Sequence, residues 1–255
     1  VERLLNAGEG GAFTVSPNGQ QVAITFPGTY NETNGAVRLY TLTNNGVLST
    51  IFNFAGVATG SHFPFYPHVT WVDDTTFRLA IPDPDQLYNE NDEDAPPFVL
   101  YEVNDSADEQ QIGAIRGSLF GVPVWNADGT KIAYLRRGTV NTFEIVVADG
   151  NGDNQQIINQ GNAGFIGIPQ WTSQGHLVTV TTRLNVLHET GRTGEVETAP
   201  IVGTPIIAGE VAVFSTREDS DYALRYVVFD DDTLTPVTII DGLTGATFSA
   251  VFVQN

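Results

Sequence analysis

Three features of the sequence predict an all-β fold built from repeated four-stranded antiparallel units. The 255 residues include 26 glycines and 13 prolines, which suits many short strands joined by turns. Alternating apolar segments follow one another along the chain without a long helical pattern. A motif of Pro-x-Trp, a small polar turn and an alternating run occurs at 122–134 and again at 168–180. A four-stranded unit that recurs after about 46 residues is typical of a β-propeller.

The inner hairpin is the best-defined element of each repeat. Besides the two segments above, hairpins are expected at 12–26, 68–81 and 204–216, and a single inner strand at 246–255. All three tryptophans, Trp71, Trp125 and Trp171, take the same place in the repeat. A large ring there can fill the wedge between neighbouring blades, where its burial is worth roughly 2–3 kcal/mol. We therefore interpret the tryptophans as structural residues of the repeat that pack in the core, not as ligand-stacking residues.

A third and a fourth strand are expected after each hairpin. The third strands are 36–42, 97–103, 143–149 and 222–229, and the fourth strands are 47–53, 109–115, 154–158 and 234–240. The turns between them are rich in Asn, Asp and Gly, which reverse a strand at low cost. The fourth repeat is the exception, because the alternation over 183–201 is weak and its outer strands are poorly defined.

These repeats predict one β-propeller domain over residues 1–255, with five or six blades of four strands. The approximate units are 1–56, 57–117, 118–164, 165–203 and 204–245, with 246–255 as a further inner or closing strand. Either this strand pairs with residues 1–7 and closes the ring, or the two ends leave open strand edges for a neighbouring subunit. We favour closure by the N- and C-terminal strands.

The segment VPVWNADGTKIAY at 122–134, with FEIVVADGNGDNQQII at 143–158, resembles the WD40-like repeat of the TolB-like propellers. The likeness extends to 12–51 through Ser16-Pro17-Asn18-Gly19, and the other units match mainly at the inner hairpin. That family includes periplasmic and cell-surface interaction modules, and similar propellers form the N-terminal part of some serine peptidases. The resemblance implies an architecture and no particular activity.

Composition restricts the partners and the compartment. The net charge is -19, from 30 acidic and 11 basic residues, which disfavours nucleic acid and favours calcium or basic partners. The absence of cysteine excludes disulfides and thiolate chemistry in this chain. The absence of methionine indicates a processed product, and no apolar run is long enough for membrane insertion. Abundant Asn, Gln, Thr and Gly favour an extracytoplasmic place: secreted, periplasmic or at the cell surface.

Catalytic motifs are weak. GSLFG at 117–121 has the wrong spacing for a nucleophile elbow, and His62 and His68 flank an aromatic connector without a regular ligand geometry. His176 lies beside a turn and His188 in the weakly patterned repeat, and neither has an evident partner. The expected inner strands contain no Asp or Glu, which argues against a glycoside hydrolase with its acid and base in the channel.

Calcium is the candidate cofactor, although none is required. DGNGDN at 149–154 has oxygen side chains at alternate positions but lacks the Gly and Glu of a calcium loop, so we interpret it as a turn. The segment 83–97 is an insertion with six carboxylates, which a cation could bridge. We favour a solvated surface loop; if the segment instead binds calcium, the candidate ligands are Asp83, Asp85, Asp92 and Asp94. Asn31 and Asn104 lie in N-glycosylation sequons and are the candidate modification sites.

Taken together, these observations predict a non-catalytic extracytoplasmic propeller, a structural or binding module. Its partner would be a protein, a glycan or another copy of itself, with no nucleic acid, and it could be a subunit of a cell-surface assembly. The alternatives are the accessory propeller of a larger serine peptidase and a five-bladed glycoside hydrolase.

Overall fold

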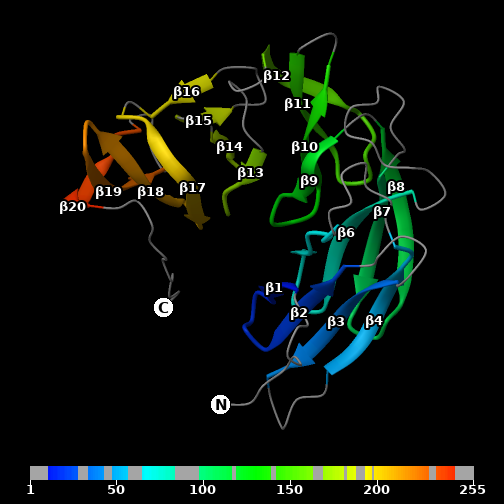
Figure 1. Ribbon diagram of the computed structural model, residues 1–255. Helices are drawn as coiled ribbons and strands as arrows, with labels where there is room; N and C mark the ends of the chain where they lie inside the picture. Colours follow the sequence, from blue (N-terminus) through cyan, green and yellow to red (C-terminus); the bar gives the residue numbers. More distant parts are fainter. Residues whose placement is uncertain are drawn as a thin grey trace. The chain divides into compact units, whose positions relative to one another are not determined.

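A computed structural model describes residues 11–27, 34–42, 48–56, 65–83, 98–116, 119–138, 142–162, 169–180, 183–187, 193–196, 198–229 and 234–244. In these ranges it contains twenty β-strands and no helix, and the strands form five four-stranded sheets (Figure 1). The prediction of an all-β fold with four-stranded units is therefore confirmed. The expected strand at 246–255 and residues 1–7 lie outside the described residues.

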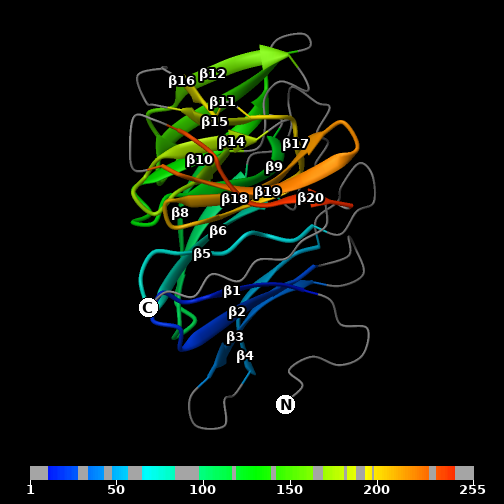
Figure 2. The ribbon, with the colours of Figure 1, turned by 90° about the vertical axis from the view of Figure 1, so that its left-hand side faces the viewer.

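The chain divides into two compact units, Val1–Ile132 with Ala148–Gln155 and Ala133–Val147 with Gln156–Asn255. The first unit contains two whole sheets, each with the strands in chain order. Blade 1 consists of β1 (Ala12–Val15), β2 (Gln21–Phe26), β3 (Gly35–Thr41) and β4 (Leu48–Phe54), drawn in blue in Figure 2. Blade 2 consists of β5 (Thr70–Trp71), β6 (Thr76–Pro82), β7 (Phe98–Asn104) and β8 (Glu109–Ile115).

The remaining three sheets have the same order. Blade 3 consists of β9 (Leu119–Trp125), β10 (Lys131–Arg137), β11 (Thr142–Asp149) and β12 (Gln156–Asn162). Blade 4 consists of β13 (Pro169–Trp171), β14 (Leu177–Val180), β15 (Leu184–Leu187) and β16 (Thr193–Glu195). Blade 5 consists of β17 (Ile201–Ala208), β18 (Val211–Glu218), β19 (Asp221–Val228) and β20 (Val237–Leu243).

Alternating apolar residues on the middle strands build the core. In blade 2, Phe77, Leu79, Phe98 and Leu100 are completely buried, because the strands that carry them are covered on both faces. In the second unit, one apolar cluster contains residues of blade 4 and of blade 5, among them Val178, Leu184, Phe214 and Val227. Blades 4 and 5 therefore share apolar surface.

The inner hairpins turn on glycines with positive φ, such as Gly129 at 70° and Gly175 at 87°. Two outer strands begin later than the sequence predicts, β12 at Gln156 and β20 at Val237. In blade 3 the reason is the long turn 149–155, in which Asn154 takes a φ of 52° before the strand begins. The short strands β15 and β16 agree with the weak alternation of the fourth repeat.

Candidate functional site

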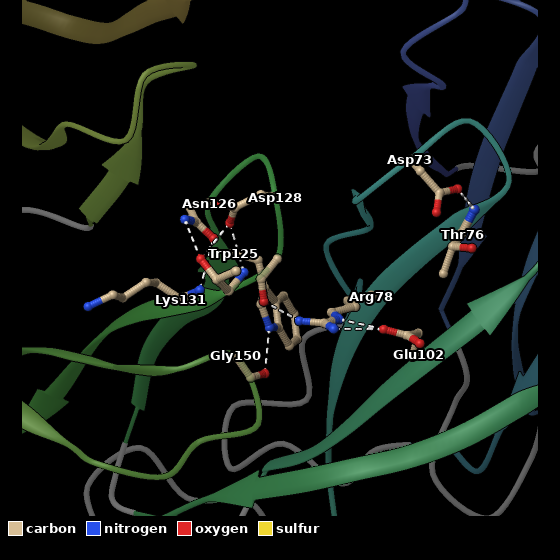
Figure 3. Close-up of polar contacts among 11 residues, drawn as sticks. Asp73, Thr76, Arg78, Glu102, Trp125, Asn126, Asp128, Lys131 and Gly150 are labelled. Carbon is tan, nitrogen blue, oxygen red and sulfur yellow. Dashed lines mark hydrogen bonds and ion pairs between the residues drawn. The ribbon is translucent and has the colours of Figure 1, made fainter.

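The turns of blades 2 and 3 form a linked polar cluster inside the first unit (Figure 3). Trp125, at the end of the inner strand β9, donates from its indole Nε1 to the carbonyl oxygen of Gly150 at 2.8 Å, and this bond is buried. Trp71 has the equivalent place in blade 2, with its ring centroid 5.4 Å from that of Phe77, yet its Nε1 has no hydrogen-bond partner among the described residues. The two buried tryptophans thus differ in one hydrogen bond.

Arg78 joins blade 2 to blade 3. Its Nε and Nη2 donate to one carboxylate oxygen of Glu102 on the next strand, at 2.9 and 2.7 Å, and its Nη1 donates to the carbonyl oxygen of Gly129 in the β9–β10 turn (Figure 3). A half-buried guanidinium that donates to acceptors on two blades is a positioning group. The bond from Arg78 therefore holds the turn that contains Gly129 in place.

Hydrogen bonds from turn residues lower the pKa values of two carboxylates. The backbone N–H groups of Thr75 and Thr76 and the Thr75 hydroxyl donate to Asp73, and these bonds hold the pKa of Asp73 below its ordinary value. The hydroxyl and backbone N–H of Thr130 do the same for Asp128. Both carboxylates accept bonds within their own turns, so their first role is to fix the turn.

The calcium-like loop 149–154 is also bonded within itself. Asn151 donates to a carboxylate oxygen of Asp153 at 2.7 Å, and Asn154 donates to Asp149. Among the described residues, no group of three or more His, Asp or Glu side chains could hold a metal ion. Of the candidate calcium ligands only Asp83 is described, because Asp85, Asp92 and Asp94 lie outside the described residues. The calcium hypothesis for 83–97 therefore stays a prediction.

An open pocket of about 160 Å³ lies between the outer strand of blade 1 and blade 2, within the first unit. It is bordered by Phe52, Asn53, Phe54, Ala55, Ile81, Pro82, Val99, Tyr101 and Glu109. Phe52 forms its aromatic floor, with a ring centroid 5.1 Å from that of Tyr101 and 6.3 Å from that of Phe54. Pockets for drug-sized ligands span roughly 300–1,000 Å³, so this one suits a single side chain or a group of similar size.

The electrostatics of this pocket are negative. Tyr101 on β7 lies opposite Gln111 of β8, which places Glu109 at the diagonal position on the same face of the sheet. Burial raises the pKa of Tyr101, and the charges of Glu109 and Asp83 raise it further. The Tyr101 phenol therefore stays protonated under the negative charge of two carboxylates, and the described lining contains no Lys or Arg. We call the pocket lined by Phe52, Tyr101 and Glu109 the acidic aromatic pocket.

A second polar cluster lies in the second unit, where the inner turns of blades 4 and 5 meet. His176 Nδ1 lies 2.9 Å from Oε2 of Glu210, and the Ser173 hydroxyl and the Gln174 N–H donate to Oε1 at 3.0 and 2.7 Å. Burial alone would raise the pKa of Glu210, but the bonds from His176 and the turn residues outweigh it and lower that pKa. An ionised Glu210 can only accept, so His176 donates from Nδ1, and in the neutral imidazole Nε2 is the nitrogen without a proton.

The other predicted site residues fall in several places. Trp171 lies on β13 and is half-buried. His68 borders a small hollow of about 40 Å³ against β1 and β2, and burial lowers the pKa of its ring. Asn104 forms a turn in which its side-chain oxygen accepts from the N–H groups of Ser106 and Asp108, so its role as a sequon stays a prediction. Asn31, His62, Ser118 and His188 lie outside the described residues.

Sequence reasoning missed both polar clusters, the one at the turns of blades 2 and 3 and the one at the inner turns of blades 4 and 5. Their members come from different repeats, and only the packing of one blade on the next brings them together. One signal was present for the second cluster: His176 and Glu210 each directly follow the glycine of an inner turn, so the repeat alignment gives them equivalent positions.

Comparison with solved structures shows a TolB-like propeller fold. TolB from Acinetobacter baumannii superposes with a TM-score of 0.55 at 15% identity, covering 89% of this chain and 53% of that one. A protein named as TolB from Agrobacterium tumefaciens superposes with a TM-score of 0.56 at 13% identity, covering 93% of this chain and 83% of that one. No protein-family model matches the sequence, and no curated protein matches it either. Identities this low establish the fold alone.

The prediction of a non-catalytic protein is wrong, because similar structures include named enzymes. A periplasmic gluconolactonase of Pseudomonas aeruginosa superposes with a TM-score of 0.50 at 15% identity, covering 92% of this chain and 70% of that one. A protein named as a 6-phosphogluconolactonase of Bacteroides fragilis has a TM-score of 0.51 at 12% identity, covering 92% of this chain and 71% of that one. A puromycin hydrolase variant has a TM-score of 0.51 at 11% identity, covering 92% of this chain and 47% of that one. The sequence argument failed because the repeat pattern specifies an architecture, and an architecture does not determine whether the protein is an enzyme.

The chain spans about half the length of the first two of these structures, at 53% for the A. baumannii TolB and 47% for the puromycin hydrolase. Within the described residues, no helix has the length and apolar character needed to cross a membrane.

Proposed function

We propose that this TolB-like propeller binds a positively charged group of a partner polypeptide in the acidic aromatic pocket. The observation that supports this is the placing of Tyr101 and Phe52 with the carboxylate of Glu109 in a hollow of about 160 Å³, with the charge of Asp83 also acting on Tyr101. The net charge of -19 favours the same class of partner, because the field of the whole chain attracts cations.

The expected affinity for a single charged group is low. A cation over a Tyr ring gains roughly 0.5–2 kcal/mol, and an exposed ion pair adds about 0.2–1 kcal/mol. The sum falls below the roughly 4 kcal/mol that corresponds to a millimolar dissociation constant. One arginine or lysine therefore binds no tighter than millimolar, and the partner must supply further contacts.

The direct test compares N-acetyl-arginine methylamide with its citrulline analogue, which has nearly the same shape without the charge. Titrations are followed by NMR on the wild type, on Glu109→Gln and on Asp74→Asn, which removes an exposed carboxylate from the inner turn of blade 2. We expect shifts near Tyr101 with the arginine ligand only, several-fold weaker binding by Glu109→Gln, and no change in Asp74→Asn. Equal binding of the two ligands would overturn the proposal.

We also infer an extracytoplasmic location. The support is the composition of the chain and the likeness in fold to a gluconolactonase named as periplasmic. Fractionation of the source cells, with an antibody raised against this chain, tests it; a signal confined to the cytoplasm contradicts it.

A second candidate function is the hydrolysis of a lactone or related ester at the blade 4 and blade 5 turns. It is favoured by the orientation of His176 through Glu210, together with the two lactonase names among the similar structures. His176 Nε2 would take a proton from water, the hydroxide would add to the carbonyl carbon, the ring C–O bond would break, and the imidazolium would return the proton to the leaving alkoxide.

The hydrolysis of δ-gluconolactone, measured by acid release at constant pH, tests this second function. We expect a rate above that of buffer alone, which His176→Ala abolishes and His68→Ala leaves unchanged. A wild-type rate equal to the buffer rate rejects lactone hydrolysis.

A further inference from the structure

The acidic aromatic pocket adjoins an open strand edge. β4 is the last strand in the order β1-β2-β3-β4, and its inner side pairs with β3 from Tyr40 opposite Leu48 to Gly35 opposite Phe54. In the part of the chain that the structure describes, no strand pairs with the other side of β4. Such an edge presents backbone N–H and C=O groups that can pair with an added strand.

The lining of the pocket shows that it follows this edge. Phe52, Asn53 and Phe54 are consecutive residues of β4, and all three line the pocket together with Ala55. Consecutive side chains of a strand point to opposite faces of the sheet. A hollow that contacts all of them therefore runs along the edge of the strand, where the backbone is also within reach.

The usable edge is short. The pairing of β3 with β4 shifts register between Val37 and Arg38, which lie opposite Phe52 and Thr50, so a bulge interrupts β4 at Ile51. The regular stretch beyond the bulge is 52–54, directly beside the pocket. An added strand of three or four residues would fit this stretch and would form only a few backbone hydrogen bonds.

We propose that the partner is an extended basic peptide segment that adds to the outer edge of β4 and places one arginine or lysine side chain in the acidic aromatic pocket. This inference rests on the proposed function and adds the form of the partner to it. Charge selects the occupant: Glu109 lines the pocket and the charge of Asp83 acts on Tyr101, and a second copy of this chain, with 11 basic against 30 acidic residues, is a poor source of a basic segment.

Strand addition and charge recognition predict different chemical sensitivities. Backbone hydrogen bonds contribute about 0.5–1.5 kcal/mol each, and a methyl group on an amide nitrogen removes the donor and adds a clash. Because the N–H groups of an extended peptide alternate in direction, methylation matters at one set of alternate positions and not at the other. Loss of the charged side chain of the peptide weakens binding whether or not the peptide backbone pairs with β4.

The experiment uses an acetylated six-residue peptide of alternating Val and Thr with one central Arg, measured by calorimetry against the wild-type chain. Two further peptides are N-methylated at the odd or at the even positions, and a fourth has citrulline for Arg. We expect one methylated peptide to bind at least about ten-fold more weakly, the other within about two-fold of the parent, and the citrulline peptide several-fold more weakly. Protection of residues 52–55 from amide exchange in the complex supports the same placement.

The contradicting results separate the two proposals. If both methylated peptides bind like the parent while citrulline weakens binding, strand addition is overturned and the proposed cation binding stands. If neither the peptide nor the arginine amide binds, the proposed function fails first. If light scattering shows a dimer that excludes the peptide, the edge belongs to a second copy and the basic partner is overturned.

Discussion

The replacement Trp125→Phe tests the hydrogen bond that links the inner strand of blade 3 to its outer turn. The mutation removes the only donor found among the described residues for the buried carbonyl oxygen of Gly150, at 2.8 Å from the indole Nε1. Leaving a buried acceptor unsatisfied costs about 1–3 kcal/mol. The smaller ring adds a loss of apolar contact, which must be measured separately.

Trp71→Phe is the matched control for that loss. Trp71 occupies the same repeat position and is 8% exposed against 3% for Trp125, but its Nε1 has no partner among the described residues. Both substitutions shrink a buried indole to a phenyl ring, so the difference between them isolates the hydrogen bond. We expect Trp125→Phe to be less stable than Trp71→Phe by about 1–3 kcal/mol.

Urea denaturation followed by far-ultraviolet circular dichroism measures this difference, provided that both variants keep the same denaturant slope. In a chain of this size each kcal/mol also moves the melting temperature by roughly 2–4 °C. Equal losses in the two variants would refute the reasoning, because the bond to Gly150 would then contribute nothing beyond the ring.

Two further predictions concern the junctions between blades. Glu210→Gln removes the charged acceptor of His176, Ser173 and Gln174 and should destabilise the fold by about 1–2 kcal/mol at neutral pH. Because the folded-state pKa of Glu210 is lowered, the stability advantage of the wild type is complete above pH 4.5 and is lost as the pH falls through the folded-state pKa. The melting temperatures of wild type and variant should therefore converge between pH 7 and pH 3, and a constant difference contradicts the assignment. Gly113→Ala should destabilise the fold by roughly 1–3 kcal/mol, because the added Cβ would overlap the backbone carbonyl of Asn151. Gly194→Ala is the control and should cost less, because its Cβ meets only the flexible end of Leu234. Equal urea midpoints for the two variants would count against tight packing of Gly113 on Asn151.

The fold could be predicted because each blade is encoded locally. The alternation in 222–229 and the turn residues in 126–130 specify strands and reversals without reference to distant residues. The outer strands of blade 4 were harder to predict, since β15 and β16 have only four and three residues and too few alternations to stand out.

The candidate sites could not be predicted, because they depend on packing between repeats. Phe52 and Tyr101 are ordinary apolar positions of outer strands, and nothing in either segment indicates that the two rings lie 5.1 Å apart. Glu109 was expected only as the first residue of a strand. The sequence identified the acidic segment 83–97 of the second repeat, which includes Asp83, but it gave no information on the aromatic residues of the pocket.

The most direct test of cation binding at the pocket is photo-crosslinking with a basic peptide. A benzophenone group placed next to the Arg of the six-residue peptide is activated on the wild-type chain, and the modified fragments are identified by mass spectrometry. We predict crosslinks at Phe52–Ala55, at the end of β4, and within β7 near Tyr101, competed by free arginine amide and reduced several-fold in Glu109→Gln. Crosslinks confined to the acidic segment 84–97, or spread over the surface without competition, would contradict this account.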